Sequence, residues 1–335
     1  MLYFPLDFFE NEIREDFMVD STMKTFWAAS LEVLREISEV CERHDIQWYA
    51  AYGTLLGAIR HQGYVPWDDD MDIWMKRTDY DRFMEFAPKE LPEGYLVQSP
   101  LTETGYTQFH SCIFNRDSVS VQEERLMKFH GCPFAVGVDI FPLDYLPDNP
   151  DEREGEKAIF QILGVTVEAI KKEDRTEEDR ESIREAIETI EEVCQVHLPI
   201  ELLDTDNERD LLVGICRLEN QLCACYGEED GSELVMYMDY MNWPSKVYRK
   251  EWFDDVKMQP FENVKIPVPK GYDEILKKIY GDYQKRVRAS GMHDYPIYKK
   301  QLEHVREVTE NLEEKVAKIN QLIDEINKKQ EKREE

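Results

Sequence analysis

The feature that most constrains this chain is a run of aspartates that leads into an apolar segment. Asp68, Asp69 and Asp70 are followed after one residue by Asp72 and then by the apolar residues 73–75. If the segment is extended, alternate side chains share a face, so the carboxylates of Asp68, Asp70 and Asp72 point the same way. Like charges this close repel strongly unless a cation lies among them. The pattern therefore predicts a divalent-cation site, and oxygen ligands at a strand edge favour Mg²⁺ or Mn²⁺.

Two other interpretations of the aspartate run are a solvated acidic turn and a calcium-binding loop. Asp68, Asp70 and Asp72 match the first three ligand positions of an EF-hand. Ile73 then stands where that loop needs glycine, and Asp79 stands where it needs a bidentate glutamate. These departures exclude the EF-hand, and the segment upstream argues against a plain acidic turn.

The segment upstream of the aspartates is typical of an anion-binding turn. Residues 46–52 form an aromatic-rich apolar run that predicts a buried strand, Gly53 and Thr54 interrupt it, and helical spacing resumes immediately afterwards. A strand, a Gly-Thr turn and a helix start can aim backbone N–H groups at a phosphate. Arg60 and His61 end the short helix, where a guanidinium could bind a phosphate through two hydrogen bonds. Together the two motifs predict a phosphate cradle beside a metal site.

Several motifs resemble one protein family. Residues 53–61, 66–73 and 138–144 resemble the LicD family of phosphocholine transferases, to which the fukutin-type phosphotransferases are related. Residues 268–272 and 279–283 are similar to the closing segment of the same family. The family belongs to the nucleotidyltransferase superfold, so the resemblance implies an α/β protein with a mixed β-sheet core flanked by helices.

The resemblance, which covers roughly residues 22–283, also implies candidate site residues. Asp70 and Asp72 match the family's metal-binding Asp-x-Asp pair, with Asp68 beside them, and Asp139 matches the carboxylate on a later strand. Asp70, Asp72 and Asp139 are therefore the predicted catalytic residues, and Asp68 joins them as a predicted metal ligand. The predicted substrate-binding residues are Gly53, Thr54, Arg60 and His61.

The resemblance implies a phosphotransferase that depends on Mg²⁺ or Mn²⁺. The donor would be CDP-choline or another CDP-alcohol, the acceptor a hydroxyl of a cell-surface glycan such as lipopolysaccharide or teichoic acid, and the leaving group CMP. Metals held by carboxylates neutralise phosphate charge in such reactions. Because the same carboxylates could serve attack at the other phosphorus, a nucleotidyltransferase that moves NMP from an NTP to a phosphorylated alcohol or sugar is the first alternative. A non-catalytic acidic interaction protein is the second.

Composition limits the partners and the location. The 335 residues carry a formal net charge of −30, which argues against nucleic acid and anionic membrane surfaces as partners. No apolar run reaches the roughly 18–20 residues of a membrane span, and the N-terminus lacks the basic region of a signal peptide. We therefore expect a cytoplasmic protein. It would meet a lipid-linked acceptor through a peripheral contact at the inner membrane face.

Changes in pattern along the chain predict four regions. Residues 1–147 form the catalytic core, and residues 148–235 form an acidic helical insert or subdomain. Residues 236–290 return to the core, and residues 291–335 form a long charged C-terminal helix. Apolar residues of this last helix follow an interrupted heptad, which could dimerise or pack back on the body.

Local signals predict the elements of the core. Ser21 or Thr22 can cap a first helix, and Thr78 can cap a second helix that ends near Pro88. Further strands, which would complete a mixed sheet, are expected at residues 95–99, 109–115 and 135–141.

Two single residues allow more than one interpretation. Asp144 follows a turn expected at Pro142 and is either a partner of the site carboxylates or a turn cap. His110 shares one strand face with Cys112 and could bind zinc, but no paired Cys-x-x-Cys spacing supports a zinc site.

Overall fold

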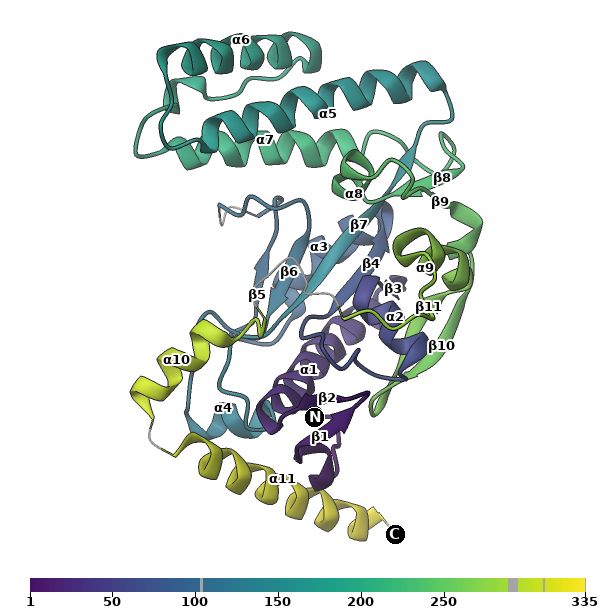
Figure 1. Ribbon diagram of the computed structural model, residues 1–335, viewed down its shortest axis with the longest axis vertical. Coiled ribbons are helices and arrows are strands. Elements are labelled where there is room, and N and C mark those ends of the chain that lie inside the picture. The colour runs from purple at the N-terminus through teal and green to yellow at the C-terminus, as the bar shows by residue number, and fades with distance from the viewer. Residues whose placement is uncertain (103–104, 289–294, 310, 335) are drawn as a thin grey trace.

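The computed structural model describes residues 1–102, 105–288, 295–309 and 311–334. It is elongated along one axis (Figure 1). A layer of helices lies at one end, a mixed sheet with flanking helices lies in the middle, and two C-terminal helices lie at the other end. The predicted α/β fold class is therefore confirmed.

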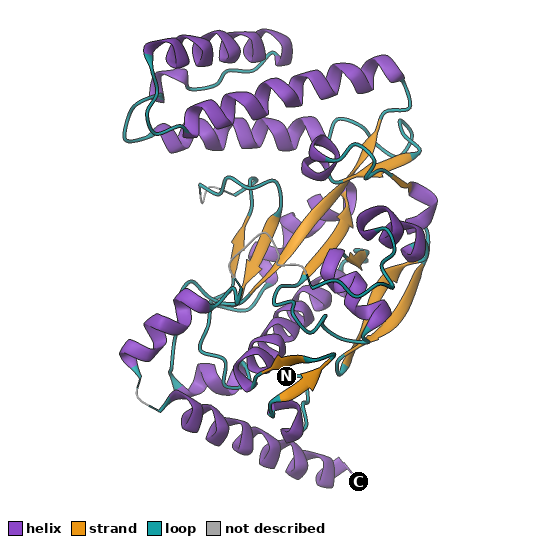
Figure 2. Cartoon of the chain, in the orientation of Figure 1, coloured by secondary structure: helices purple, strands orange, loops and turns teal. Residues whose placement is uncertain are grey.

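The central sheet has seven strands in the described residues and follows the path β3-β4-β7-β6-β5, with β8 and β9 continuing from β7. β4 and β7 run parallel, whereas the other pairs of the sheet are antiparallel. Figure 2 shows β7 as the long strand through the middle of the molecule. The strands are β3 (Trp48–Ala50), β4 (Asp72–Lys76), β5 (Leu96–Gln98), β6 (Ser111–Phe114), β7 (Gly137–Leu146), β8 (Glu233–Val235) and β9 (Tyr248–Arg249).

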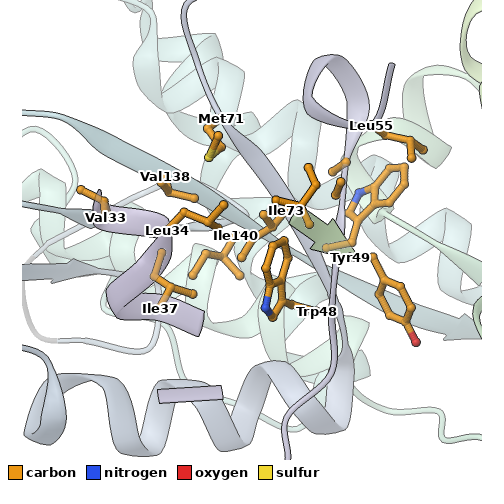
Figure 3. Packing of buried hydrophobic residues seen from close by; sticks show 14 of the residues in the cluster. Val33, Leu34, Ile37, Trp48, Tyr49, Leu55, Met71, Ile73, Val138 and Ile140 are labelled. Carbon is orange, nitrogen blue, oxygen red and sulfur yellow. The ribbon is translucent and has the colours of Figure 1, made fainter. Parts of the chain in front are cut away.

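The three strands predicted after the aspartate run are confirmed as β5, β6 and β7, and β7 extends five residues beyond the expected end, to Leu146. Helix α1 (Ser21–Arg43) packs against the sheet, and its buried side chains form part of the core. This core is made of branched and aromatic side chains from the helix and from three strands (Figure 3). Its members include Val33, Leu34, Ile37, Trp48, Ile73, Val138 and Ile140.

Two helix starts differ from the predictions. Asp20, and neither Ser21 nor Thr22, caps α1, because its side chain accepts a hydrogen bond from the backbone N–H of Met23 at 2.8 Å. Helix α3 (Arg77–Glu90) begins one residue before Thr78, which therefore does not cap it. The same helix continues past its internal proline by two residues, so the predicted stop was early.

Only the last aspartate of the run belongs to a strand. β4 begins at Asp72, and Asp68 to Asp70 lie in the loop that follows the turn at Pro66 and Trp67. Helix α2 (Tyr52–Arg60) also begins earlier than expected, so Gly53 and Thr54 lie in its first turn instead of in a separate loop. Pairing of β3 with β4 accounts for the start of β4 and the start of α2. The last hydrogen bond of this pairing runs from the N–H of Ala51 to the carbonyl of Asp72 at 3.0 Å, directly before α2 begins.

Three long helices with an apolar core of their own lie within residues 150–223, and the predicted division into regions stays a prediction. They are α5 (Pro150–Lys171), α6 (Glu177–Cys194) and α7 (Glu208–Cys223), with the short turn η2 (Ile200–Leu202) between the last two. Isoleucine and leucine side chains at helical spacing fill the space between them. The buried members include Leu163, Ile183, Ile187, Ile190, Leu211 and Ile215.

A buried ion pair joins this insert to the sheet. Arg77, at the start of α3, donates two hydrogen bonds to the carboxylate of Asp144 on β7 and a third to the side-chain oxygen of Asn220 on α7. Asp144 lies inside the strand, because Pro142 does not interrupt β7 with a turn. Neither expectation for Asp144, a site partner or a turn cap, was therefore right.

Two hairpins and the remaining helices complete the core. One hairpin is near the N-terminus, and the other packs with α9 against α2. Among the described helices, none combines the length and the apolar character needed to cross a bilayer. The elements are η1 (Leu6–Phe9), β1 (Glu12–Arg14), β2 (Phe17–Val19), α4 (Glu123–Lys128), α8 (Tyr237–Asn242), η3 (Lys250–Phe253), β10 (Val256–Phe261), β11 (Val264–Pro269) and α9 (Tyr272–Tyr280).

The C-terminal segment is two helices and not the single one predicted. α10 (Lys299–Val308) ends at Thr309, whose backbone is extended with φ −145° and ψ 118°, and α11 (Leu312–Glu334) begins after Asn311, whose φ of +60° is left-handed. Ile319 and Ile323 of α11 pack on α4. Ile319, one residue of the predicted heptad, thus contacts the body of the molecule, whereas Leu322 and Ile326 of the same heptad are 44% and 43% exposed.

Candidate active site

Two aspartates lie side by side at the start of neighbouring parallel strands. Asp72 of β4 pairs in register with Asp139 of β7, so both side chains project from the same face of the sheet. The pairing is anchored by a hydrogen bond of 2.9 Å from the N–H of Asp139 to the carbonyl of Met71. Two of the predicted carboxylates, separated by 67 positions in the sequence, are therefore neighbours.

The turn before β4 adds further carboxylates. Asp68, Asp69 and Asp70 each offer an oxygen, and these three oxygens lie within 4.8 Å of one another. The carboxylate of Asp69 is 1% exposed and accepts a hydrogen bond from the N–H of Ile297 at 2.7 Å, so it anchors the C-terminal segment. Asp68 and Asp70 are less buried and are the members of the turn available for a ligand.

The electrostatics of these carboxylates indicate a site built for a cation. The pKa of Asp68 is well above its ordinary value because the carboxyl is desolvated and Asp70 lies next to it. The pKa of Asp72 is raised by its burial and by the charges of Asp70, Asp139 and Asp68. A divalent cation would relieve the repulsion and the desolvation penalty that raise these two pKa values. The donor set, made only of hard carboxylate oxygens, fits Mg²⁺ or Mn²⁺.

The predicted Gly-Thr turn holds the carboxylates in place. A Cβ at Gly53 would lie 2.1 Å from Oδ2 of Asp68, so only glycine lets the aspartate turn approach the helix this closely. The buried hydroxyl of Thr54 accepts a hydrogen bond of 2.9 Å from the N–H of Asp72. In this structure, both residues therefore position the aspartates, and their predicted contact with phosphate stays a prediction.

The residue before this turn has an unusual backbone. Tyr52 has a φ of +39°, which a bulky side chain rarely adopts and which is often found at functional sites. Its hydroxyl donates to Oδ2 of Asp239 at 2.9 Å, and its ring packs edge-on against Trp74 and Phe141. The surrounding aromatic core thus holds the chain in the sharp strand-to-helix turn that brings Gly53 against the aspartates.

Arg60 and His61 lie at the other end of α2. Seven residues separate Arg60 from Gly53, which is about 10 Å along a helix. Arg60 Nε donates to Nε2 of His61 at 2.8 Å, and its Nη1 donates to the carbonyl of Tyr283. Burial and the nearby Arg60 charge lower the pKa of His61 to about 4. His61 is therefore neutral at pH 7 and has its proton on Nδ1, facing Glu15.

Tyr280 connects the two groups of predicted residues. Desolvation and the charges of Asp68, Asp72 and Asp70 raise the pKa of Tyr280, so its phenol lies within the electrostatic influence of these carboxylates. The pKa of Arg60 is in turn influenced by Tyr280. Tyr280 ends α9 and belongs to one of the motifs quoted above, but nothing in the motif itself marked it as a site residue.

His110 is a site residue that the sequence singled out only as a possible zinc ligand. Its Nε2 lies 3.6 Å from Oδ1 of Asp139 and 3.2 Å from the hydroxyl of Tyr106, and its ring packs on Phe141. Burial lowers the pKa of His110, so the imidazole is neutral at pH 7. Cys112 follows on the same strand and is the register partner of Asp139. The alternation of His110 and Cys112 was visible, but it suggested zinc because their distance from Asp139 depends on strand pairing.

Burial and the adjacent Asp139 raise the pKa of the Cys112 thiol, so this thiol stays protonated at neutral pH. A protonated thiol is a poor zinc ligand. The feature that His110 and Cys112 share is therefore their proximity to Asp139.

Comparison with known proteins identifies relatives of the segment that carries these residues. Residues 45–148 match the family described as LicD/FKTN/FKRP, nucleotidyltransferase domain. Over 269 residues the chain is 27% identical to the lipopolysaccharide cholinephosphotransferase LicD of Haemophilus influenzae, an alignment that spans 79% of this chain and 92% of that protein.

Two shorter matches fall on uncharacterised proteins. One, from Rickettsia typhi, is 34% identical over 67 residues, which is 20% of this chain and 22% of that protein. The other, from Rickettsia prowazekii, is 35% identical over 66 residues, which is 20% of this chain and 25% of that protein. The long match is therefore the one that bears on the whole arrangement of core and insert.

Proposed function

We propose, from the premise that residues 45–148 are a LicD-family nucleotidyltransferase domain, that the protein transfers phosphocholine or a related phospho-alcohol from a CDP-activated donor to a glycan hydroxyl. The observation that carries this proposal is the convergence of Asp72 and Asp139 from paired parallel strands on the carboxylates of the preceding turn. The name of the Haemophilus relative supports choline phosphate as the transferred group and a lipopolysaccharide as one acceptor of this class.

The metal implied by the proposal is Mg²⁺, with Mn²⁺ as the other candidate. Asp68, Asp70, Asp72 and Asp139 would hold it, because their desolvated carboxylates repel one another without a cation. When bound, such a metal neutralises charge on the donor diphosphate. Gly53 and Thr54 support the proposal by fixing the two aspartates nearest to them.

The chemistry that the protein's own groups would supply is proton removal and positioning. The acceptor hydroxyl oxygen forms a bond to the phosphorus of the phosphocholine group, the bond from that phosphorus to the bridging oxygen breaks, and CMP leaves with the bonding electron pair. We assign the acceptor proton to the Asp139 carboxylate, with neutral His110 orienting Asp139 through the contact at Nε2. Tyr280 and Arg60 lie on the α2 side, where the nucleotide phosphates would bind.

The proposed location follows from the proposed substrates. A CDP-alcohol is an activated metabolite of the cytoplasm, so we place the protein there, with contact at the inner membrane face when the acceptor is lipid-linked. A dimer through α11 is not needed for the site, because the predicted carboxylates all come from one chain.

The test is a product assay on purified protein. CDP-choline, CDP-ethanolamine, CDP-glycerol, CDP-ribitol and CTP are titrated with and without Mg²⁺, and CMP and pyrophosphate are then measured with a glycan acceptor present. Metal-dependent binding of one CDP-alcohol with release of CMP is the expected result and identifies the donor. Release of pyrophosphate from CTP would replace the proposal by nucleotidyl transfer. Absence of binding for all five compounds would favour a non-catalytic protein.

A further inference from the structure

A separate cavity of about 120 Å³ lies where the helical insert meets the end of the sheet. The first turns of α5 and the end of α7 form its walls, close to α8 and β8 in Figure 1. Liquid water occupies about 30 Å³ per molecule, so the space corresponds to about four waters or one small organic group. The lining residues are Glu156, Ile159, Phe160, Leu222, Cys225 and Tyr226.

Glu156 is the only acidic residue among those lining residues. Both of its carboxylate oxygens are buried, and the described residues give neither oxygen a hydrogen bond of ordinary geometry, although burial raises the pKa of Glu156 and the neighbouring phenol of Tyr237 lowers it in part, as a donor would. Arg153 lies one turn earlier on α5, but it donates its hydrogen bonds to the carboxylate of Glu233 at 2.8 Å and to the carbonyl of Pro147 at 2.9 Å. A buried carboxylate with only a phenol beside it is costly to ionise.

Aromatic rings surround this carboxylate. Phe160 lies one turn further along α5, and Tyr226 lines the cavity from the segment after α7. Tyr237 stacks on Phe160 with 4.7 Å between ring centroids. The charge of Glu156 contributes to the raised pKa of Tyr237, after burial, which places the two side chains close together. The hydroxyl of Tyr237 is itself buried and has no hydrogen bond of ordinary geometry among the described residues.

We propose that this cavity binds a small organic ammonium cation, with Glu156 as its counter-ion and Phe160 and Tyr226 as aromatic faces. A carboxylate combined with aromatic faces is the arrangement that recognises alkylammonium groups. A bare Mg²⁺ or Ca²⁺ fits poorly, because such ions take six or more oxygen ligands and the cavity offers one carboxylate. Burial raises the pKa of Glu156 to about 7, and a bound cation would favour its ionised form.

The cavity is distinct from the aspartate site. Asp139 lies near the beginning of β7, and Leu146, at the end of that strand, packs in the same apolar cluster as Phe160 and Tyr237. Seven residues of extended chain span about 23 Å. The inference therefore goes beyond the proposed function, and a ligand in this cavity would join the insert to the core without touching the reacting phosphate.

The experiment is a binding titration of the full chain at pH 8, where Glu156 is largely ionised. Choline, ethanolamine and tetramethylammonium chlorides are compared with sodium chloride at equal ionic strength by calorimetry and by thermal unfolding. We expect at least one organic cation to bind and to raise Tm, and Glu156→Gln to weaken that binding at least tenfold. Glutamine is nearly isosteric and removes a buried charge, so the variant should fold.

Three further variants make the result specific. Glu154→Gln changes an exposed residue of the same helix and should bind as the wild type does. Tyr226→Leu removes one aromatic face and should weaken choline binding several-fold. Asp70→Asn should leave choline binding unchanged, which separates this cavity from the aspartate site. The proposal is overturned if no organic cation binds better than Na⁺, if Glu156→Gln binds like the wild type, or if Asp70→Asn abolishes binding.

Discussion

A Cβ atom at Gly53 would lie 2.1 Å from Oδ2 of Asp68, so the Asp68 carboxylate keeps this position beside the helix start only when residue 53 is glycine. The atom displaced by a larger residue is the end of a side chain. The Asp68 carboxylate would therefore rotate away while the backbone stayed in place. We predict that Gly53→Ala lowers kcat at least tenfold, measured as CMP release, with a far-UV spectrum unchanged from the wild type.

The matched control for this prediction is Gly155→Ala. Gly155 lies within α5 and has nothing within 4 Å of the added Cβ. Alanine is favoured over glycine in a helix by about 0.5–1 kcal/mol, so the control should be as active as the wild type and slightly more stable. Equal activity in the two variants would show that the contact between Gly53 and Asp68 has no role in turnover.

Removal of one negative charge from the aspartate site should abolish activity and, without metal, raise thermal stability. The pKa of Asp72 is raised, so its ionised form opposes folding at any pH above the unfolded-state value near 3.9. We predict that Asp72→Asn abolishes CMP release and, without metal, unfolds at a higher temperature than the wild type at pH 7.5. Adding Mg²⁺ should raise Tm of the wild type more than Tm of the variant.

Asp117→Asn serves as the control, since Asp117 is an exposed residue in the loop after β6. It should change neither turnover nor the response of Tm to Mg²⁺. Near wild-type turnover in Asp72→Asn would contradict the assignment of Asp72 to the site.

Local patterns were sufficient to predict the core strands and the carboxylates. Apolar residues 73–75 after the aspartates indicated a strand, and the later Asp139 was found from the motif around it. What the local pattern could not give was the point at which the strand starts. β4 begins at Asp72 because that residue pairs with Asp139 of β7. This pairing joins distant parts of the chain.

The same reason explains the residues that were missed. His110 reaches Asp139 only through the antiparallel register of β6 with β7, and Tyr280 reaches the aspartates through packing of α9 on α2. The break between α10 and α11 was missed because the apolar heptad continues on both sides of it. Periodicity records which face of a helix is apolar, but the extended backbone of Thr309 ends α10 without changing that periodicity.

The buried ion pair between Arg77 and Asp144 predicts a large loss of stability when one partner is removed. Arg77→Met leaves the Asp144 carboxylate, which is 1% exposed, without its two hydrogen bonds. We expect the free energy of unfolding to fall by about 3–5 kcal/mol, as found when one half of a buried pair is lost. Urea unfolding followed by circular dichroism measures this change.

The double variant Arg77→Met with Asp144→Leu tests the cause. It removes both charges, so it should recover most of the lost stability. Arg184→Met, which breaks only exposed ion pairs on α6, should cost no more than about 1 kcal/mol. A small effect of Arg77→Met would show that the insert is held to the sheet by its apolar contacts alone.

Glu219 predicts a dependence of stability on pH. It is 2% exposed on α7, and burial raises its pKa to about 7, with only partial compensation by Lys171 and Cys216. The folded state therefore holds a proton that the unfolded state releases near pH 4.3. As far as this group is concerned, stability is highest below about pH 4.3 and falls as the pH rises to about 7.

Glu219→Gln removes this loss. We expect the variant to be more stable than the wild type at pH 8, by at most about 3 kcal/mol, and equally stable at pH 4.5. Glu188→Gln, an exposed change in the same insert, should show no difference at either pH. Equal stability of Glu219→Gln and the wild type at pH 8 would mean that the pKa of Glu219 is not raised in the folded protein.

We predict that His110 influences the reaction through Asp139. Its neutral imidazole lies 3.6 Å from Oδ1 of Asp139, and Phe141 and Tyr106 hold the ring in place. Loss of a group that orients a metal ligand typically lowers metal affinity or activity by about 10–100-fold. We expect His110→Ala to lower kcat and to raise the Mg²⁺ concentration needed for half-maximal activity, with KM for the donor changed less than threefold.

Gln should replace His110 partly, because its neutral side-chain amide keeps a polar N–H group near Asp139, so His110→Gln is expected to lie between His110→Ala and the wild type. His197→Gln, at an exposed histidine of the insert, should match the wild type in all three kinetic quantities. A purely structural role for His110 would lower Tm and leave the Mg²⁺ dependence unchanged. The shift in Mg²⁺ dependence is therefore the measurement that decides whether the His110–Asp139 contact serves the reaction.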